Sequence, residues 1–267
     1  MGFHQVILSC NEDPVYMEFW PLVSWAYKKI FPEATVHLAY LTLQNTDNGY
    51  ADEHGKITSF NPLPGIPEFA QAKMIRYILA SQQGDDVCYI DDIDLFPLSR
   101  PFILSKTNNR KKGHLLCVGG EVYDNIGSYP ASQMTAEGNV WKQLINPHNK
   151  TYSELWDEWK NTPTMFDRRE NPCIVTNWDK DDYFSDERLI RRLLHLNPVP
   201  KQEMERGYTN YLDATIDRHT FKSNENFWEY DREKLKNHGY VNAHGIRPYS
   251  KYQKHYQLLI QYINDNY

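Results

Sequence analysis

The chain has 267 residues, which is enough for one large domain or two small ones. It is 40% hydrophobic and 24% charged, as globular proteins are, and this excludes bulk disorder. The formal net charge of −6 argues against broad nucleic-acid binding, because proteins that neutralise phosphates need a basic surface.

Strand and helix patterns alternate along the first hundred residues. Apolar strand patterns and amphipathic helix patterns cover six segments: strands at 6–9, 35–41, 57–60 and 87–90, and helices at 17–30 and 68–83. The segment 61–67 contains three prolines and cannot be regular structure. The alternation predicts an α/β fold with a mostly parallel central sheet flanked by helices. In such folds the ligand binds at the carboxyl ends of the strands.

Beyond residue 100 the pattern is less regular. Residues 114–118 form a strand pattern, and helical patterns cover 138–145, 152–159, 185–196 and 252–264. No repeat or linker is visible, so we expect a single domain over residues 1–267. Its front half is regular and its back half is irregular.

The chain shows no sign of export or of a disulfide framework. It has no long apolar segment, so we expect neither a signal peptide nor a transmembrane segment, and a cytoplasmic location. Cys10, Cys88 and Cys117 lie in or beside strand patterns, which predicts buried free thiols.

Three carboxylates, Asp91, Asp92 and Asp94, follow the strand at 87–90. Carboxylates repel one another and are costly to desolvate, so such a cluster usually needs a cation. Asp92 and Asp94 project to the same side of an extended segment, as hard oxygen ligands of the kind Mg²⁺ or Mn²⁺ prefers. This predicts a metal site for a phosphate-bearing substrate. The third acid leaves open whether Asp91 or Asp92 pairs with Asp94.

The segment His244-Gly245-Ile246-Arg247-Pro248 comes late in the chain. Imidazole is a natural third ligand for Mn²⁺, and a nearby arginine can neutralise phosphate with two donors. The alternative to a metal and phosphate site is a surface turn that happens to contain a histidine. The presence of the Asp cluster favours the metal and phosphate site.

Two helical segments carry further candidates. Asp186 and Glu187 open the helix at 185–196, where acids commonly cap the first turn. A carboxylate there could instead deprotonate an attacking hydroxyl, and the sequence leaves open which one acts. Lys73 and Arg76 are three apart and share a face of the helix at 68–83, either as its solvated side or as cations that reach the substrate.

The triplet Asp92-Ile93-Asp94 resembles the DXD motif of the GT-A class of nucleotide-sugar-dependent glycosyltransferases, which also follows a strand. The segment around His244 partly resembles the C-terminal His-Gly-(Lys/Arg)-Pro element of families related to glycogenin and bacterial galactosyltransferases. Its spacing is tighter than the usual HxxGxxKP form. The resemblance implies that Asp92, Asp94 and His244 hold Mn²⁺ or Mg²⁺, with Asp94 the direct ligand and Asp92 a ligand or ribose contact. Arg247 would bind the diphosphate.

The same resemblance implies roles for the helix residues. Lys73 and Arg76 would reach the donor, and Asp186 or Glu187 would contact the acceptor hydroxyl or the transferred sugar. Residues 1–100 would form the nucleotide-sugar-binding half, and residues 101–267 the acceptor-binding half.

We therefore expect a metal-dependent glycosyltransferase, a hexosyl- or pentosyltransferase. It would move a sugar from a nucleotide-diphosphate donor, with UDP-sugar favoured, to a hydroxyl of a glycan, glycoconjugate or other acceptor. A bacterial or viral origin suits a cytoplasmic enzyme of this kind. One alternative is a haloacid-dehalogenase-type phosphohydrolase, although that family places Thr or Val where this chain has Phe96. The other is a non-catalytic nucleotide- or sugar-binding protein.

Overall fold

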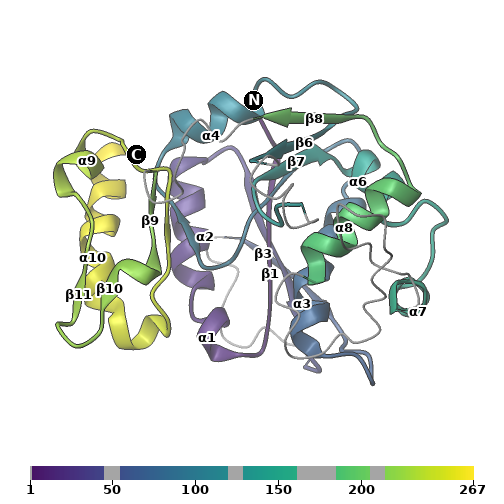
Figure 1. Cartoon of the computed structure of the whole chain (residues 1–267), viewed down its shortest axis with the longest axis horizontal. Helices are drawn as coiled ribbons and strands as arrows, with labels where there is room; N and C mark the ends of the chain where they lie inside the picture. The colour runs from purple at the N-terminus through teal and green to yellow at the C-terminus, as the bar shows by residue number, and fades with distance from the viewer. Residues whose placement is uncertain (1, 45–54, 120–128, 161–184, 205–213) are drawn as a thin grey trace, which may run out of the picture.

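A computed structural model describes residues 2–44, 55–119, 129–160, 185–204 and 214–267, and its largest element is a seven-stranded sheet (Figure 1). The strands are β1 (Gln5–Asn11), β2 (Thr35–Leu41), β3 (Lys56–Phe60), β4 (Val87–Ile90), β6 (Leu115–Val118), β7 (Met134–Glu137) and β8 (Lys201–Met204). Their order is β3-β2-β1-β4-β7-β6-β8. Neighbouring strands pair in parallel except β7, which is antiparallel to β4 and to β6. The predicted α/β fold with a mostly parallel sheet is confirmed.

The helices of the described residues are α1 (Pro14–Met17), α2 (Trp20–Ile30), α3 (Glu68–Ser81), α4 (Arg100–Thr107), α6 (Gly138–Ile145), α7 (Tyr152–Lys160), α8 (Ser185–Leu196), α9 (Arg232–Lys236) and α10 (Tyr249–Asn266). Helix α2 covers one face of the large sheet, and α3, α6 and α8 cover the other. Side chains alternate along β1, so Val6 and Leu8 join the buried cluster that contains α2 and α10. Ile7 points the other way and joins the cluster that contains α3, α6 and α8.

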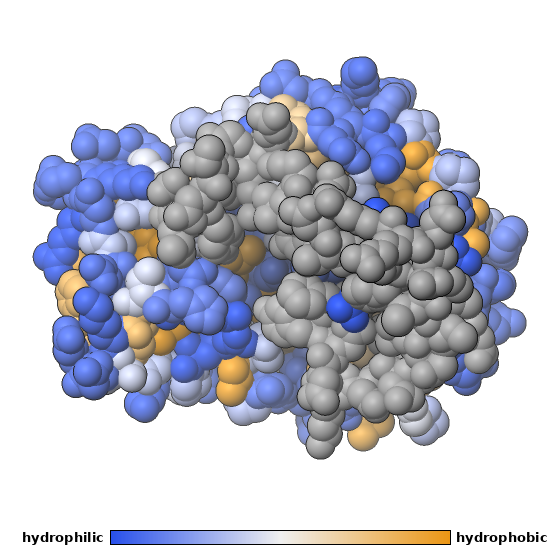
Figure 2. All heavy atoms as spheres, viewed as in Figure 1, coloured by the Kyte–Doolittle hydropathy of each residue, from blue (hydrophilic) through white to orange (hydrophobic). Residues whose placement is uncertain are grey.

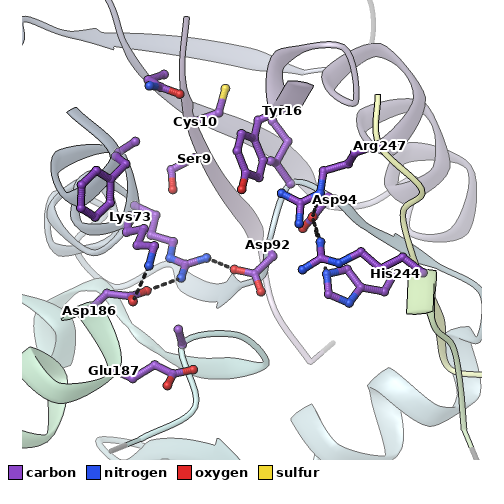
Figure 3. Close-up of a pocket in the computed structure, with 17 residues that line it drawn as sticks. Ser9, Cys10, Tyr16, Lys73, Asp92, Asp94, Asp186, Glu187, His244 and Arg247 are labelled. Carbon is purple, nitrogen blue, oxygen red and sulfur yellow. Dashed lines mark hydrogen bonds and ion pairs between the residues drawn. The ribbon is translucent and has the colours of Figure 1, made fainter. Parts of the chain in front are cut away.

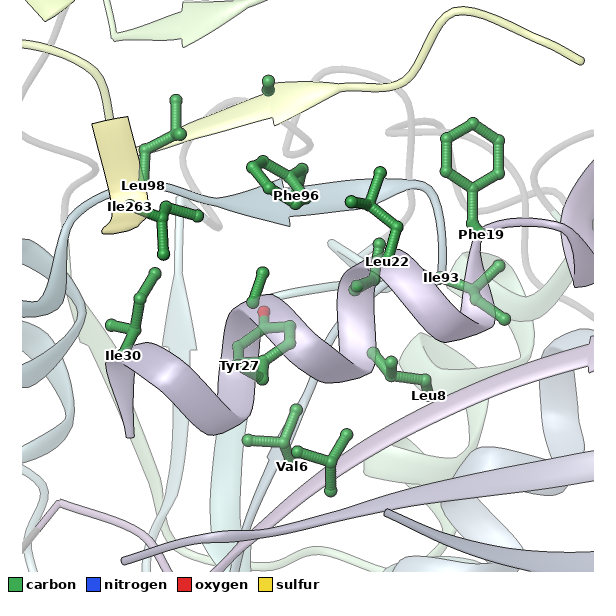
Figure 4. Packing of buried hydrophobic residues seen from close by; sticks show 14 of the residues in the cluster. Val6, Leu8, Phe19, Leu22, Tyr27, Ile30, Ile93, Phe96, Leu98 and Ile263 are labelled. Carbon is green, nitrogen blue, oxygen red and sulfur yellow. The ribbon is translucent and has the colours of Figure 1, made fainter. Parts of the chain in front are cut away.

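A second, three-stranded sheet lies over α2. Its order is β5 (Leu95–Pro97), β12 (Asn242–His244) and β9 (Thr215–Ile216). Helix α2 is packed between the two sheets, with Val6 and Leu8 on one side and Phe96 and Leu98 on the other (Figure 4). The packing holds the late segments of the chain against its first strands.

The pairing of β5 with β12 brings the two sequence motifs together. Strand β5 begins directly after Asp94, and β12 runs antiparallel to it with His244 opposite Leu95. The backbone N–H of Gly245 donates to the carbonyl of Asp94 at 2.8 Å. His244 is therefore beside the Asp cluster although 150 residues separate Asp94 from His244 in the sequence (244 − 94).

Several elements differ from the sequence-based expectations. The helix predicted over 17–30 begins only at Trp20, and the separate short helix α1 ends at Met17, because Pro21 fits the first turn of a new helix and would break the interior of a longer one. The short strands β5, β7, β8 and β9 and the helices α4 and α9 were not predicted. The predicted free thiols Cys10, Cys88 and Cys117 are buried and unpaired by any disulfide.

The described surface is mainly hydrophilic in the view of Figure 2. Four large hydrophobic side chains are exposed among the described residues: Leu43, Leu196, Phe227 and Leu258. None of the described helices combines the length and apolar character that a membrane crossing requires.

Candidate active site

A pocket of about 170 Å³ opens beyond the carboxyl ends of β1 and β4 (Figure 3). All eight predicted site residues line it: Lys73, Arg76, Asp92, Asp94, Asp186, Glu187, His244 and Arg247. They come from α3, the loop after β4, the first turn of α8, and the end of β12 with the turn that follows. The position agrees with the rule that ligands of parallel sheets bind at the carboxyl ends of the strands.

The structure separates Asp91 from the other two acids of the cluster. Asp91 is buried beneath the pocket, where the hydroxyl of Tyr27 donates a hydrogen bond to its carboxylate. Burial, and then the charge of Asp92, raise the pKa of Asp91 to about 8. Asp92 and Asp94 both line the pocket. Of the two acids that could pair with Asp94, Asp92 is the one that shares the pocket with it.

Asp94 is the centre of a cationic cluster. Its Oδ2 lies 2.9 Å from Nη1 of Arg218, 3.5 Å from Nε2 of His244 and 3.6 Å from Nε of Arg247. Burial would raise the pKa of Asp94, but the hydrogen bond with His244 and the three neighbouring cations lower it to about 2. Burial likewise opposes protonation of His244, yet its contacts with Asp217 and Asp94 raise its pKa to about 9.

Arg76 joins Asp92, which lies in the middle of the pocket, to Asp186 on the side away from Asp94 (Figure 3). Its guanidinium is buried, donates to the side chain of Asp92 and donates to Oδ2 of Asp186 at 3.0 Å. Nζ of Lys73 lies 3.6 Å from Oδ1 of the same Asp186. Because both carboxylates and the guanidinium have close partners, this chain of ion pairs ties α3, the end of β4 and α8 together.

Glu187 has a different environment from Asp186. Only 8% of the residue is exposed, it lines the pocket, and its Oε2 has no hydrogen-bond partner among the described residues. Burial, and then the charge of Asp186, raise the pKa of Glu187 to about 8. A buried carboxyl oxygen without a partner is costly, so its presence beside a pocket points to a ligand that completes it.

The residues predicted to hold a metal supply suitable donors. Asp94 and His244 are in contact, and Asp92 lines the same pocket with its side chain 38% exposed. Two carboxylates and an imidazole are a donor set that suits Mn²⁺. As the described side chains stand, no three acids, histidines or cysteines already converge on one metal position. Their charges are balanced instead by arginines.

Two polar residues that line the pocket, Arg218 and Tyr16, were not identified from the sequence. Arg218 comes from the segment after β9 and Tyr16 from α1. Asp217, next to Arg218, lies 3.4 Å from Nδ1 of His244 through its Oδ2. The guanidinium carbon of Arg247 lies over the Tyr16 ring, 4.8 Å from its centroid, in a cation–π contact. No motif marks Arg218, because its place depends on the pairing of β9 with the distant strand β12.

No protein-family model matches the chain, and no curated protein matches it in sequence. Among solved structures, it is similar to the galactosyltransferase LgtC in complex with donor and acceptor sugar analogues. That match has a TM-score of 0.48 and 12% identity, and covers 98% of this chain and 95% of the other. An active-site mutant of LgtC matches with a TM-score of 0.47 and 12% identity over 90% of this chain and 86% of the other.

A third similar structure is described as a nucleotide-diphospho-sugar transferase from Desulfovibrio desulfuricans G20. Its TM-score is 0.42 and its identity 5%, over 76% of this chain and 79% of the other. Similarity at this level concerns the path of the chain alone. The chemistry of this protein has to be argued from its own pocket residues.

Proposed function

We propose that this chain is a glycosyltransferase that moves a sugar from a nucleotide-diphosphate donor to a hydroxyl of a glycan or other acceptor. The observation that carries the proposal is the division of one pocket into two chemically different sides. One side has two carboxylates, an imidazole and guanidinium groups, and the other side has a buried carboxyl group with an unpaired oxygen. The first side suits a diphosphate, and the second suits a sugar or an acceptor hydroxyl.

On the diphosphate side, Asp92, Asp94 and His244 would hold Mn²⁺ or Mg²⁺. When bound, the metal supplies positive charge where the leaving diphosphate becomes more negative. Arg247 contributes two guanidinium donors for phosphate oxygens, and its cation–π contact with Tyr16 holds it in place. A UDP-sugar is the donor we favour, in keeping with the sequence resemblance.

On the acceptor side, the two acids of α8 have separate tasks. Asp186 is engaged by Lys73 and Arg76, so it positions these cations. Glu187 retains a free oxygen facing the pocket and is the group we assign to the sugar or acceptor hydroxyl. With a pKa of about 8 it is mostly protonated at neutral pH and donates a hydrogen bond, and above that pH it can accept the proton of the attacking hydroxyl.

The test is an Asp94→Asn variant assayed for sugar transfer from a panel of nucleotide sugars with Mn²⁺. We expect transfer to fall by at least about 100-fold, since charge stabilisation of this kind is worth about that much. Asp157→Asn, on the exposed side of α7, is the control and should keep full activity.

A metal-responsive, fully active Asp94→Asn protein would contradict the proposal. NMR of the product's anomeric proton would then identify the sugar linkage in the active enzyme. Release of phosphate from an aryl phosphate would favour the phosphohydrolase alternative. Tight donor binding by the wild type without any turnover would favour a binding protein.

A further inference from the structure

Arg218 is a cationic residue of the pocket that no sequence motif identified. Its Nη1 donates to Oδ2 of Asp94 at 2.9 Å, a shorter distance than that of Arg247 to the same oxygen. The side chains of Arg218 and Arg247 are 17% and 21% exposed, and both line the pocket. Arg218 is therefore held at the pocket wall with its guanidinium partly accessible.

Positively charged groups outnumber carboxylates in the immediate surroundings of Asp94. Two guanidinium groups and an imidazole contact one carboxylate oxygen, Oδ2 of Asp94. A single carboxylate cannot fill the ten N–H donor positions of two guanidinium groups, which carry five each. The cluster therefore has unused donors for a second anion with several oxygens, as a diphosphate has.

The backbone next to Arg218 is held by hydrogen bonds, and its side chain lines the pocket. The carbonyl of Asp217 accepts from Nε1 of Trp228 at 3.0 Å and from the hydroxyl of Thr220 at 2.8 Å. The carboxylate of Asp217 lies 3.4 Å from Nδ1 of His244. Asp217 thus contacts His244, and the next residue, Arg218, contacts Asp94. Because the hydrogen bonds to the Asp217 carbonyl hold the backbone, the Arg218 guanidinium can shift without moving the chain that supports it.

We propose that Arg218 is a second diphosphate-binding residue that pairs with Asp94 before the donor binds and turns to the donor's phosphate oxygens when a metal ion takes Asp94. This proposal rests on the proposed function. It adds to that function a cation that competes with the metal for Asp94 and afterwards cooperates with the metal on the diphosphate. Removing Arg218 should therefore strengthen the binding of the metal alone, because a competitor for Asp94 is lost, and weaken the binding of the diphosphate, because a cation is lost.

The experiment uses Arg218→Gln and measures three affinities in the full-length protein by titration calorimetry. The first is for the member of the set UDP, GDP, CDP and ADP that the wild type binds most tightly with Mn²⁺. The second is for the corresponding monophosphate, and the third is for Mn²⁺ alone. Arg232→Gln, an exposed position at the start of α9, is the matched control and should change none of them.

We expect Arg218→Gln to weaken nucleoside diphosphate binding about tenfold, since a charge-assisted hydrogen bond is worth about one such factor. Monophosphate binding should change less, and Mn²⁺ alone should bind more tightly because its competitor is gone. A merely structural role would weaken all three affinities, and that result would overturn the proposal. Unchanged diphosphate binding would overturn it too. If the wild type binds none of the four nucleotides, the proposed function itself fails, and this proposal fails with it.

Discussion

At the scale of single residues, the same functional group behaves in different ways because its neighbours differ. Asp91 lies under the pocket against Tyr27, and burial keeps its pKa near 8. Asp94, three positions later, is surrounded by cations and has a pKa of about 2. Residue type alone could not separate these two acids. Contacts with residues far away in the chain decide which one is available to a ligand.

Glu187 makes a testable contribution to the pH dependence of stability. Its pKa rises from 4.5 to about 8 on folding, mainly through burial, so the folded protein holds a proton that the unfolded chain has lost. The free energy of unfolding therefore falls as pH rises from 4.5 through about 8. Below pH 4.5 this contribution is complete.

Glu187→Gln should remove this share of the pH dependence. We expect the decline to be shallower in the variant by up to about 1.4 kcal/mol per pH unit, the limit for one proton. Urea unfolding at several pH values measures it. The pKa of Asp91 is raised in the same direction, so Asp91 should still make the free energy of unfolding fall with pH in both proteins. Identical slopes would show that Glu187 is not the buried acid we describe.

At the scale of elements, the turn after β12 determines where His244 and Arg247 lie. Gly245 begins this turn, and its N–H is bonded to the carbonyl of Asp94. A methyl group on Gly245 would lie 2.5 Å from the ring of Phe19, which is closer than packed atoms come. The turn thus passes over α2 with only enough room for glycine. The ring of Phe19, the residue just before α2, therefore limits the path of this turn.

Gly245→Ala should therefore displace this turn. We expect a loss of about 1–3 kcal/mol in the free energy of unfolding, the usual cost of overpacking. Affinity for nucleoside diphosphate should also fall, because both His244 and Arg247 move. Urea unfolding and calorimetric titration measure the two effects. A variant with unchanged stability and unchanged affinity would mean that the turn adapts without cost.

At the scale of the whole molecule, α10 and the small sheet belong to the same hydrophobic cluster as β1 and α2. Tyr256, Leu259 and Ile263 of α10 are fully buried in it. The hydroxyl of Tyr256 also donates to the carbonyl of Ile246, in the turn that carries the site residues. This shared core predicts that the central sheet and the C-terminal helix unfold together.

Leu259→Ala tests this cooperativity. We expect it to lower the free energy of unfolding by about 2–5 kcal/mol, as other buried leucine truncations do. The urea transition should remain single and coincide by far-UV circular dichroism and tryptophan fluorescence. A separate early transition, with the sheet intact after α10 has unfolded, would show that the two parts are independent units.

Local patterns in the sequence were sufficient to predict those strands and helices that have many apolar residues at regular spacing. Strands β1, β2 and β4 and helices α3 and α8 were predicted closely for that reason. Strands β5, β9 and β12 have two or three residues each and exist because they pair with one another. No local periodicity can reveal so short a strand.

The same limit applied to the site. Asp92, Asp94, His244 and Arg247 belong to recognisable segments and could be proposed from the sequence, and the structure brings them together in one pocket. Arg218 depends on β9 lying beside β12, a pairing between residues 215–216 and 242–243 that carries no motif. The partnership of Arg76 with Asp186 was missed for the same reason, since it spans 110 positions.

Strand β12 lies between β5 and β9, and this has a consequence for the synthesis of the protein. A ribosome makes β5 and β9 first, and both lack their common partner until β12 has emerged. A nascent chain that ends before His244 has the carboxylates of the pocket without the imidazole and Arg247. If the proposed function holds, donor binding should therefore begin only after Arg247 has been made and β12 has paired with β5 and β9.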